Sequence, residues 1–491
     1  MRAVLLLSVL AAAACGTTVP MAQQPAAVAS ADDLAPAGSA AQEPGASSVS
    51  GATGAGRTPN RVPSSSGNAP AAAGGAAAPV PATAPPGAVT ATTVTIGVSY
   101  AVNAGAANAA FGGKGITTGD EKGEAEAVIA DLNAHGGLLG RKVVPLFYQR
   151  DAQSTSTSTS QAQTECTFYT QDHHVLAVLE GNGPVDWAMK PCLTQKGVIA
   201  ITAHIASLDD DSTARTQHVD ITGMSISRMA TAMLAAAQSQ RWLDPWNAAT
   251  ASKGATPAKV GLIGYDLPEV HRTVSSVIVP GLKRLGATLV SSSTIFITVP
   301  QSTADTGASA AAVQASVLRM RSDGVTHVVF VDQGGALTLL YANEATSQSY
   351  YPRYLGSSSA GWQALLTGGD IQPKVLTGAV GAGWEPVIDL ATPARYLTPQ
   401  ASTCLKLLKG KGFSFSDPNA EAVGLAYCDK ASFLRAAFRD GSWATDSLGD
   451  LATARGLGSH FGPGRHDGAA AFYAMVFNGQ DMTYVGAEQR L

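Results

Sequence analysis

Polar and aromatic residues directly follow several apolar runs of the sequence, where they could bind a small molecule. If the runs are parallel strands, these residues lie beyond the carboxyl ends of the sheet. Helix N-termini meet there and offer unpaired N–H groups to an anion such as a carboxylate. We therefore predict the following ligand-binding residues: Asn182, Pro184, His204, Ser207, Tyr265, Asp332, Gln333, Ser358 and Trp384.

Several of these residues also have a purely structural interpretation. Asn182 could only shape its turn, and His204 could be a capping or solvated histidine. A serine such as Ser207 often caps a helix. Asp332 could be a structural carboxylate at the end of a strand, and Trp384 could belong to the core.

Motifs for catalysis are absent from the sequence. Gly97-Val98-Ser99-Tyr100 continues with Ala101, so the GxSxG nucleophile motif is not formed, and no HExxH occurs. Asp209-Asp210-Asp211 is interpreted as a solvated acidic turn rather than a glycosidase pair. Gly115 follows Lys114 where a phosphate loop needs Ser or Thr, so no nucleotide cofactor is expected. The sequence favours binding over catalysis.

The segment 125–151 predicts the elements that would position these residues. Ala125, Val128, Ile129 and Leu132 have the spacing of one apolar helix face, and the helix should end at Gly136-Gly137. Alternating residues 94–98 and the apolar run 143–148 predict strands before and after it. Strand, helix and strand form a βαβ unit with parallel strands. Similar alternation recurs to about residue 357, which predicts an α/β protein with parallel sheets.

Within this segment, DLNAHGGLLGRKV followed by an apolar strand and Asp151 resembles the first repeat of the type I periplasmic binding proteins. The similarity is to the branched-chain amino-acid-binding family of ABC transporters. The resemblance implies two Rossmann-like lobes with parallel sheets, joined by a three-segment hinge, and a small polar ligand between the lobes. It implies no cofactor and no catalytic or metal site.

Comparison with the family's amino-acid binders also reveals departures. The paired serine that helps to hold the ligand carboxylate falls on Pro184, and the loop acid falls near Ser358. The cleft tyrosine falls near Val270. A simple leucine-like amino acid is therefore doubtful as the ligand, and Asp332 is the best substitute acid.

Domain boundaries follow from composition and from the resemblance. Residues 1–14 predict a signal peptide, and residues 15–91 are an Ala/Pro/Gly/Ser segment that predicts a disordered tether. We expect residues 92–218 and 383–471 to form the first lobe. The second lobe would comprise residues 219–382 and 472–491.

The sequence Ala12-Ala13-Ala14-Cys15-Gly16 resembles a bacterial lipobox, whose cysteine would be lipidated. An ordinary signal cleavage with an incidental cysteine is the alternative. The lipobox reading predicts an exported protein anchored to the outer face of the cytoplasmic membrane.

Four further cysteines remain, an even number that predicts disulfide bonds in an exported protein. Four cysteines allow three pairings, and we favour Cys166 with Cys192 and Cys404 with Cys428, because each pair would join neighbouring helices. Zinc binding with His173 and His174 lacks ligand spacing.

The charge balance points away from nucleic acid as a partner. The formal net charge is −4, only 14% of residues are charged, and no Lys/Arg block occurs. We therefore predict a solute-binding lipoprotein that captures an amino acid or related compound by hinge closure for an ABC transporter permease. Alternatives are a sensory binding protein of the same fold and, less favoured, a secreted hydrolase.

Overall fold

The computed structural model describes residues 85–114, 116–181, 186–203, 208–213, 216–415, 417–439 and 442–490. The predictions for Cys15, Asn182, Pro184, His204 and Ser207 lie outside these residues, as do the signal peptide and most of the tether. The described fold begins before the predicted residue 92. Ala88 is already fully buried, and Val89 forms a bridge with Val94.

The first of two large sheets is wholly parallel. Its ten-residue strand β1, second from one edge, pairs along its whole length with the edge strand β2, from Thr93 opposite Lys142 to Val102 opposite Asp151. The strands in spatial order are β2 (Lys142–Asp151), β1 (Thr93–Val102), β3 (Ala177–Leu179), β4 (Ile199–Thr202) and β5 (His218–Asp220).

The second sheet is larger and mixed. Its strands in spatial order are β18 (Met482–Arg490), β17 (Ala471–Phe477), β12 (Val380–Gly383), β11 (Arg353–Ser357), β10 (His327–Val331), β8 (Val260–Tyr265) and β9 (Leu289–Ile297). The five strands from β9 to β12 run parallel. The last two strands, β17 and β18, are antiparallel, a feature that the prediction of parallel sheets lacked.

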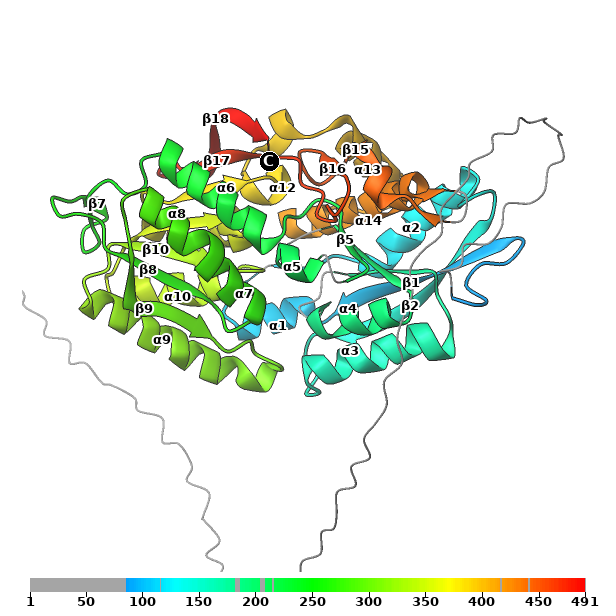
Figure 1. Ribbon diagram of the computed structural model, residues 1–491, viewed down its shortest axis with the longest axis horizontal. Coiled ribbons are helices and arrows are strands. Elements are labelled where there is room, and N and C mark those ends of the chain that lie inside the picture. The colour runs from blue at the N-terminus through cyan, green and yellow to red at the C-terminus, as the bar shows by residue number, and fades with distance from the viewer. Residues whose placement is uncertain are drawn as a thin grey trace, which may run out of the picture. The chain divides into compact units, whose positions relative to one another are not determined.

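Helices cover both sheets and define two lobes (Figure 1). The first lobe holds α2 (Glu121–Ala134), α3 (Ser158–Thr167), α4 (Asp186–Gln195), α5 (Asp210–Thr213), α12 (Pro386–Asp389), α13 (Pro399–Gly410) and α14 (Pro418–Ala437). The second holds α6 (Ile226–Ser239), α7 (Pro268–Thr273), α8 (Val279–Arg284), α9 (Thr306–Ser322), α10 (Ala336–Ser347) and α11 (Trp362–Thr367). Short hairpins pair β6 (Trp246–Asn247) with β7 (Ser252–Lys253), β13 (Phe438–Arg439) with β14 (Ser442–Trp443), and β15 (Gly449–Leu451) with β16 (Ser459–Phe461).

Local sequence explains why α2 begins and ends where it does. The Asp120 side chain caps the helix by accepting a hydrogen bond from Gly123 N at 3.0 Å. The helix buries its predicted apolar face, and the chain then turns through Gly136 and Gly137, both at positive φ. A Cβ at Gly137 would lie 2.0 Å from the Arg141 carbonyl oxygen, so this turn requires glycine. The predicted βαβ unit is therefore confirmed.

The chain passes between the lobes three times in the described residues. It crosses first between β5 and α6, and it returns between β12 and α12. The third passage runs from β16 to β17. These three connections provide the hinge that the resemblance implied.

Both predicted disulfides are confirmed. Cys166 of α3 bonds Cys192 of α4, and Cys404 of α13 bonds Cys428 of α14. Each bond therefore joins two neighbouring helices of the first lobe.

Among the described residues, no helix combines the length and the apolar character that crossing a bilayer requires.

Candidate ligand-binding cleft

A cavity of about 350 Å³ lies where the carboxyl ends of strands from both sheets face each other. The first lobe contributes Ala101 near the end of β1 and Asp151 at the end of β2. The second contributes Tyr265 at the end of β8, Gln333 after β10 and Ser358 after β11. Because loops and helix N-termini converge at this edge of a parallel sheet, the cavity lies where α/β proteins bind small molecules.

Three of the predicted residues, Tyr265, Gln333 and Ser358, line this cavity. Burial, and after it the charge of Asp332, raises the pKa of the Tyr265 phenol, which stays a neutral hydrogen-bond donor. The side-chain amide of Gln333 is buried and has no hydrogen-bond partner among the described residues. An unpaired buried amide is costly in free energy, which makes Gln333 the best candidate for a polar ligand contact.

Two predicted residues are placed elsewhere. Both carboxylate oxygens of Asp332 are used internally: Oδ1 accepts from Gln333 N at 2.7 Å, and Oδ2 accepts from Thr338 N and Oγ1 at 2.8 and 2.7 Å. Asp332 thus organises the turn into α10 beneath the cavity. Trp384 is 1% exposed and packs in the core of the second lobe, so it does not cover the cavity.

A segment for which the sequence predicted neither a helix nor a strand forms one wall of the cavity. We call residues 103–114 and 116–118 the strap; it contains the short helix α1 (Ala104–Ala110), which Figure 1 shows between the two lobes. Phe111 and Ile116 of the strap pack against the core of the second lobe. Lys114 N donates to Asp370 Oδ1 of that lobe at 2.5 Å.

The strap is also held by the first lobe, from which it starts. Thr117 N donates to Asp417 Oδ2 at 2.8 Å, and Asn419 Nδ2 donates to the Thr117 carbonyl at 2.6 Å. At its start, Asn103 Nδ2 donates to Asp151 Oδ1 at 2.9 Å. The strap is therefore fastened to both sides of the cleft. Its alanine-rich sequence has no apolar periodicity that would have revealed this.

Two arginines that sequence reasoning missed also line the cavity. Arg150 forms a buried ion pair with Glu165. Arg455 Nη2 lies 2.7 Å from Glu385 Oε2, and both side chains are almost fully buried. The Arg455 Nε has no hydrogen-bond partner among the described residues. Each arginine thus brings its own neutralising carboxylate to the cleft.

Side chains of the two lobes meet at two further places. Asp209, which precedes α5, pairs with Arg272 of α7 at 2.6 Å. The predicted solvated acidic turn is therefore wrong for Asp209, which is only 3% exposed. At the entry to α3, Ser158 N and Oγ donate to Gln301 O and Oε1 at 2.8 and 2.6 Å, so this serine-rich entry is not simply solvated.

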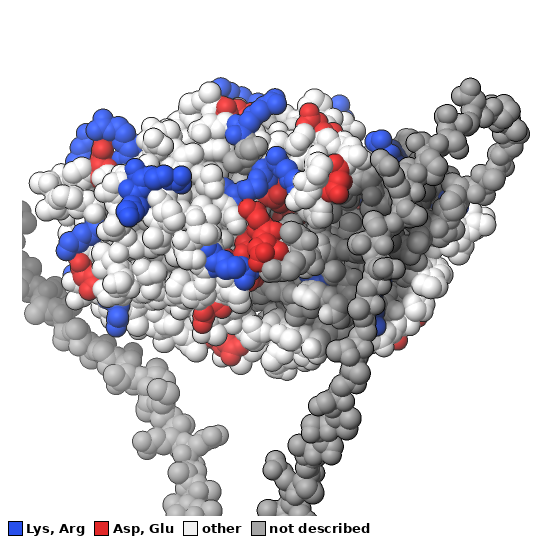
Figure 2. All heavy atoms as spheres, viewed as in Figure 1, with Lys and Arg blue, Asp and Glu red and all other residues white. Residues whose placement is uncertain are grey.

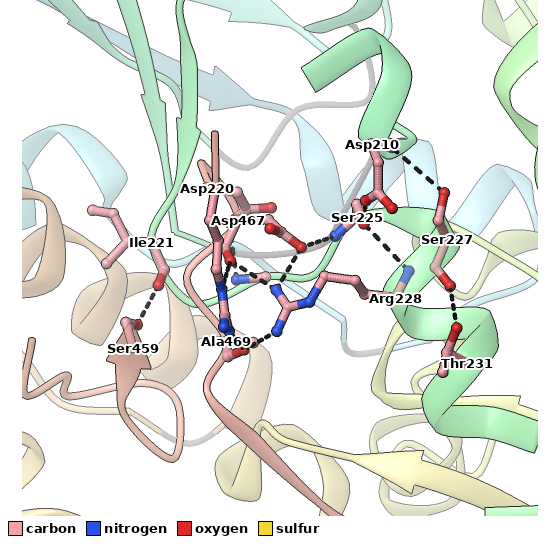
Figure 3. A network of polar contacts seen from close by, with 12 residues as sticks. Asp210, Asp220, Ile221, Ser225, Ser227, Arg228, Thr231, Ser459, Asp467 and Ala469 are labelled. Carbon is pink, nitrogen blue, oxygen red and sulfur yellow. Dashed lines mark hydrogen bonds and ion pairs between the residues drawn. The ribbon is translucent and has the colours of Figure 1, made fainter. Parts of the chain in front are cut away.

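The first and third hinge connections are bound to each other by the network in Figure 3. Arg228 Nη1 donates to Asp467 Oδ2 at 2.6 Å and to the Asp467 carbonyl at 2.8 Å. Its Nη2 donates to the Ala469 carbonyl at 2.7 Å. Ser225 N adds a bond to Asp467 Oδ2 at 2.6 Å. The Arg228 guanidinium therefore helps to hold the two connections together, beside backbone hydrogen bonds such as that from Gly468 N to the Asp220 carbonyl at 2.7 Å.

The second connection has its own polar centre at Asp389. Its Oδ2 accepts from Tyr484 OH at 2.6 Å and from Ser358 Oγ at 2.7 Å. Ser358 in turn accepts from Trp384 N at 2.9 Å. Burial raises the pKa of Asp389 to about 7, although these hydrogen bonds oppose the rise. Ser358 thus links a cavity-lining loop to the hinge.

Charges of both signs are interspersed on the face shown in Figure 2, separated by broad uncharged areas. This face has no large area of a single charge in its described part.

No family model and no curated protein sequence matches the chain. Solved structures do. A substrate-binding protein of an Aeropyrum pernix ABC transporter superposes with a TM-score of 0.56 at 13% identity, over 81% of this chain and 96% of its own. The leucine-binding protein LivK of Thermotoga maritima superposes with a TM-score of 0.55 at 15% identity, over 81% of this chain and 99% of its own. A fatty acid ABC transporter substrate-binding protein of Thermomonospora curvata gives 0.51 at 15% identity, over 84% and 95%.

These superpositions, with the two sheets and three connections, define the class. The chain has the α/β fold of the type I periplasmic binding proteins, which confirms the resemblance seen in the sequence.

Proposed function

We propose that this protein is an extracytoplasmic solute-binding protein that captures a small molecule between its two lobes by closing about its hinge. One observation carries the proposal: the cavity is bounded by the carboxyl ends of strands from both sheets. A molecule in it would touch both lobes at once. Its binding would therefore favour the closed arrangement by contacts that an open one lacks.

The names of the similar structures agree with this role. Those from Aeropyrum pernix and Thermomonospora curvata are substrate-binding proteins of ABC transporters, the latter for fatty acids, and LivK is a leucine-binding protein. We propose the same partnership here, with a permease receiving the ligand from the closed protein. The binding role requires no catalytic residue, cofactor or metal.

The test of ligand capture is a screen of the full chain by thermal shift, against amino acids, amides, short-chain acids and peptides. A true ligand at about 100 times its dissociation constant should stabilise the fold by roughly 2.7 kcal/mol. Small-angle scattering with and without that ligand then measures closure. If no compound raises the melting temperature, or if a bound ligand leaves the radius of gyration unchanged, capture by hinge closure is contradicted.

Transport and sensing need a separate experiment. Deleting the gene should abolish uptake of the identified ligand if the protein serves a permease. Normal uptake after deletion would favour the alternative of a sensory binding protein.

We also propose that Cys15 carries a lipid that anchors the mature protein to the outer face of the cytoplasmic membrane. Support comes from the short apolar run and the small residues directly before the cysteine. In the Cys15→Ser variant the protein should leave the membrane fraction and enter the medium. Unchanged membrane partition would refute the anchor.

A further inference from the structure

The cleft is apolar on the strap side. Ala104, Ala107, Phe111 and Ile116 of the strap line the cavity, and Leu339 and Leu365 of the second lobe line it as well. Leu339 and Leu365 are almost fully buried. The strap and this wall lie in contact, since a Cβ at Gly113 would come within 3.4 Å of Leu339 Cδ2. Apolar surface of this kind favours binding when it covers apolar parts of a ligand, because both surfaces are then removed from water.

Charge around the cavity is largely balanced by the protein itself. Arg150 and Arg455 are paired with Glu165 and Glu385. Among the described residues, Asp151 is the one carboxylate that lines the cavity, and its Oδ1 already accepts from Asn103 and Gln153. An anionic ligand group would lose its hydration without gaining an unpaired cation, at a considerable cost. Among the carboxylates of the described lining, an ammonium would find only Asp151, whose Oδ1 is already hydrogen-bonded by two neutral donors.

The polar atoms that lack partners are of a different kind. The Gln333 amide has an unsatisfied oxygen and an unsatisfied nitrogen, and the Arg455 Nε is an unsatisfied donor. An amide both donates and accepts, and another amide group complements both functions at once. A carboxylate could satisfy only the nitrogen of Gln333, and an ammonium only its oxygen.

We propose that the cleft selects a molecule with an apolar body and an uncharged amide-like head. This inference rests on the proposed function. The strap would cover the body, and Gln333 would hydrogen-bond the head. This inference departs from the zwitterionic amino acid that the sequence resemblance suggested.

Four compounds that share an isobutyl group test the inference: isocaproamide, isocaproate, leucine and isoamylamine. Calorimetry on the full chain should show isocaproamide binding at least tenfold more tightly than each charged compound. Tighter binding of any charged member, or no binding of the amide, would overturn the inference. If a charged compound binds and closes the lobes, the proposed function still stands. If no compound of the wider screen binds, the proposed function itself fails.

Variants of the protein test separately its contacts with the head and with the body of the ligand. Gln333→Leu should weaken isocaproamide by about tenfold, while Gln333→Glu should weaken the amide and improve isoamylamine. Phe111→Ala should weaken the amide about tenfold, whereas Ala109→Ser, at an exposed strap position, should leave affinity unchanged. Melting temperatures of all four variants check that the fold is retained. Amide affinity that is unaltered in both Gln333 variants would overturn the assigned head contact, and unaltered affinity in Phe111→Ala would overturn the role of the strap.

Discussion

Arg272 and Asp209 form a two-point ion pair across the cleft, 63 residues apart in the chain. Arg272 Nε donates to Asp209 Oδ2 at 2.6 Å, and Nη2 donates to Oδ1 at 3.0 Å. Nη2 also donates to Ser212 Oγ at 2.8 Å. Planar guanidinium and carboxylate groups meet in this way only in one relative orientation. Because separation of the lobes would break this pair, we predict that it acts as a latch on the closed arrangement.

Removing the latch should shift the unliganded protein toward open forms. The Arg272 side chain is 40% exposed, so solvent screening reduces the pair's contribution to about 1 kcal/mol, or roughly a fivefold change in the closed population. In Arg272→Gln we expect a larger radius of gyration and about fivefold weaker ligand binding. Arg319→Gln, at an exposed position of α9, is the control. Equal scattering curves and affinities for the two variants would rule out a latch.

Acid should weaken the same pair. Burial alone would raise the pKa of Asp209, but hydrogen bonds from Arg272 and Ser212 outweigh it and hold that pKa below the ordinary 3.8. The stabilisation is therefore present above pH 3.8 and is lost as the pH falls through the lowered pKa. Asp209 stays ionised between pH 5 and 8, so its titration should not change the closure measured by scattering in that range. A loss of closure near pH 6 that Asp209→Asn abolishes would contradict this.

The hinge network should contribute to global stability. Asp467→Asn removes the charge that accepts from Arg228 and from Ser225 N, in a setting where Asp467 is 8% exposed. We expect the free energy of unfolding to fall by about 2 kcal/mol in chemical denaturation. Asp450→Asn alters an ion pair whose carboxylate is 88% exposed and should cost under about 0.5 kcal/mol. Similar losses of unfolding free energy in the two variants would show that the hinge network contributes no more to stability than an exposed ion pair.

Glu124 should make stability depend on pH. Burial first, and then the charges of Glu121 and Asp120, raise its pKa from 4.5 to about 8. Because the folded state holds this proton more tightly, its stabilisation is complete below pH 4.5 and is lost as the pH rises to about 8. Glu124→Gln should therefore gain roughly 3–4 kcal/mol relative to the native protein between pH 5 and pH 8.

Denaturation curves at the two pH values measure this gain. Glu126→Gln is the matched control, since Glu126 lies on the same helix with its side chain 53% exposed. Parallel pH profiles for native protein and Glu124→Gln would disprove the raised pKa.

Trp384 should be a stability residue. Truncation to Ala leaves a large cavity in the core of the second lobe and should lower the free energy of unfolding by about 3–5 kcal/mol. Leu318→Ala, at a side chain that is 53% exposed, should have little effect. A Trp384→Ala variant as stable as Leu318→Ala would contradict the core assignment.

The sequence predicted those features that local patterns determine. The helix at 125–132, its glycine stop and the following strand follow from spacing and backbone geometry, and the disulfides follow from cysteines on neighbouring helices. The antiparallel β17 and β18 escaped prediction because an apolar strand carries no mark of its direction. Tyr265 and Gln333 were found because strand ends converge on one edge of a sheet.

Other parts of the site depend on tertiary contacts alone. Asp332 and Trp384 follow strands just as Gln333 does, and only the direction of each side chain separates core from cavity. Asp209 and Arg272 are distant in sequence, so nothing local indicates that they meet. Phe111 lies among alanines and glycines, and its role depends on the second lobe's surface.

The two disulfides have a consequence for how the molecule responds to its surroundings. Both lie in the first lobe, and the sequence has no cysteine between 192 and 404 or after 428. In an oxidising compartment the first lobe is therefore cross-linked covalently, whereas the second lobe is held by packing and hydrogen bonds. Neither cross-link spans the hinge, so thiol oxidation cross-links the first lobe internally without cross-linking it to the second. If the lobes close as proposed, reduction of the disulfides should therefore leave that movement unblocked.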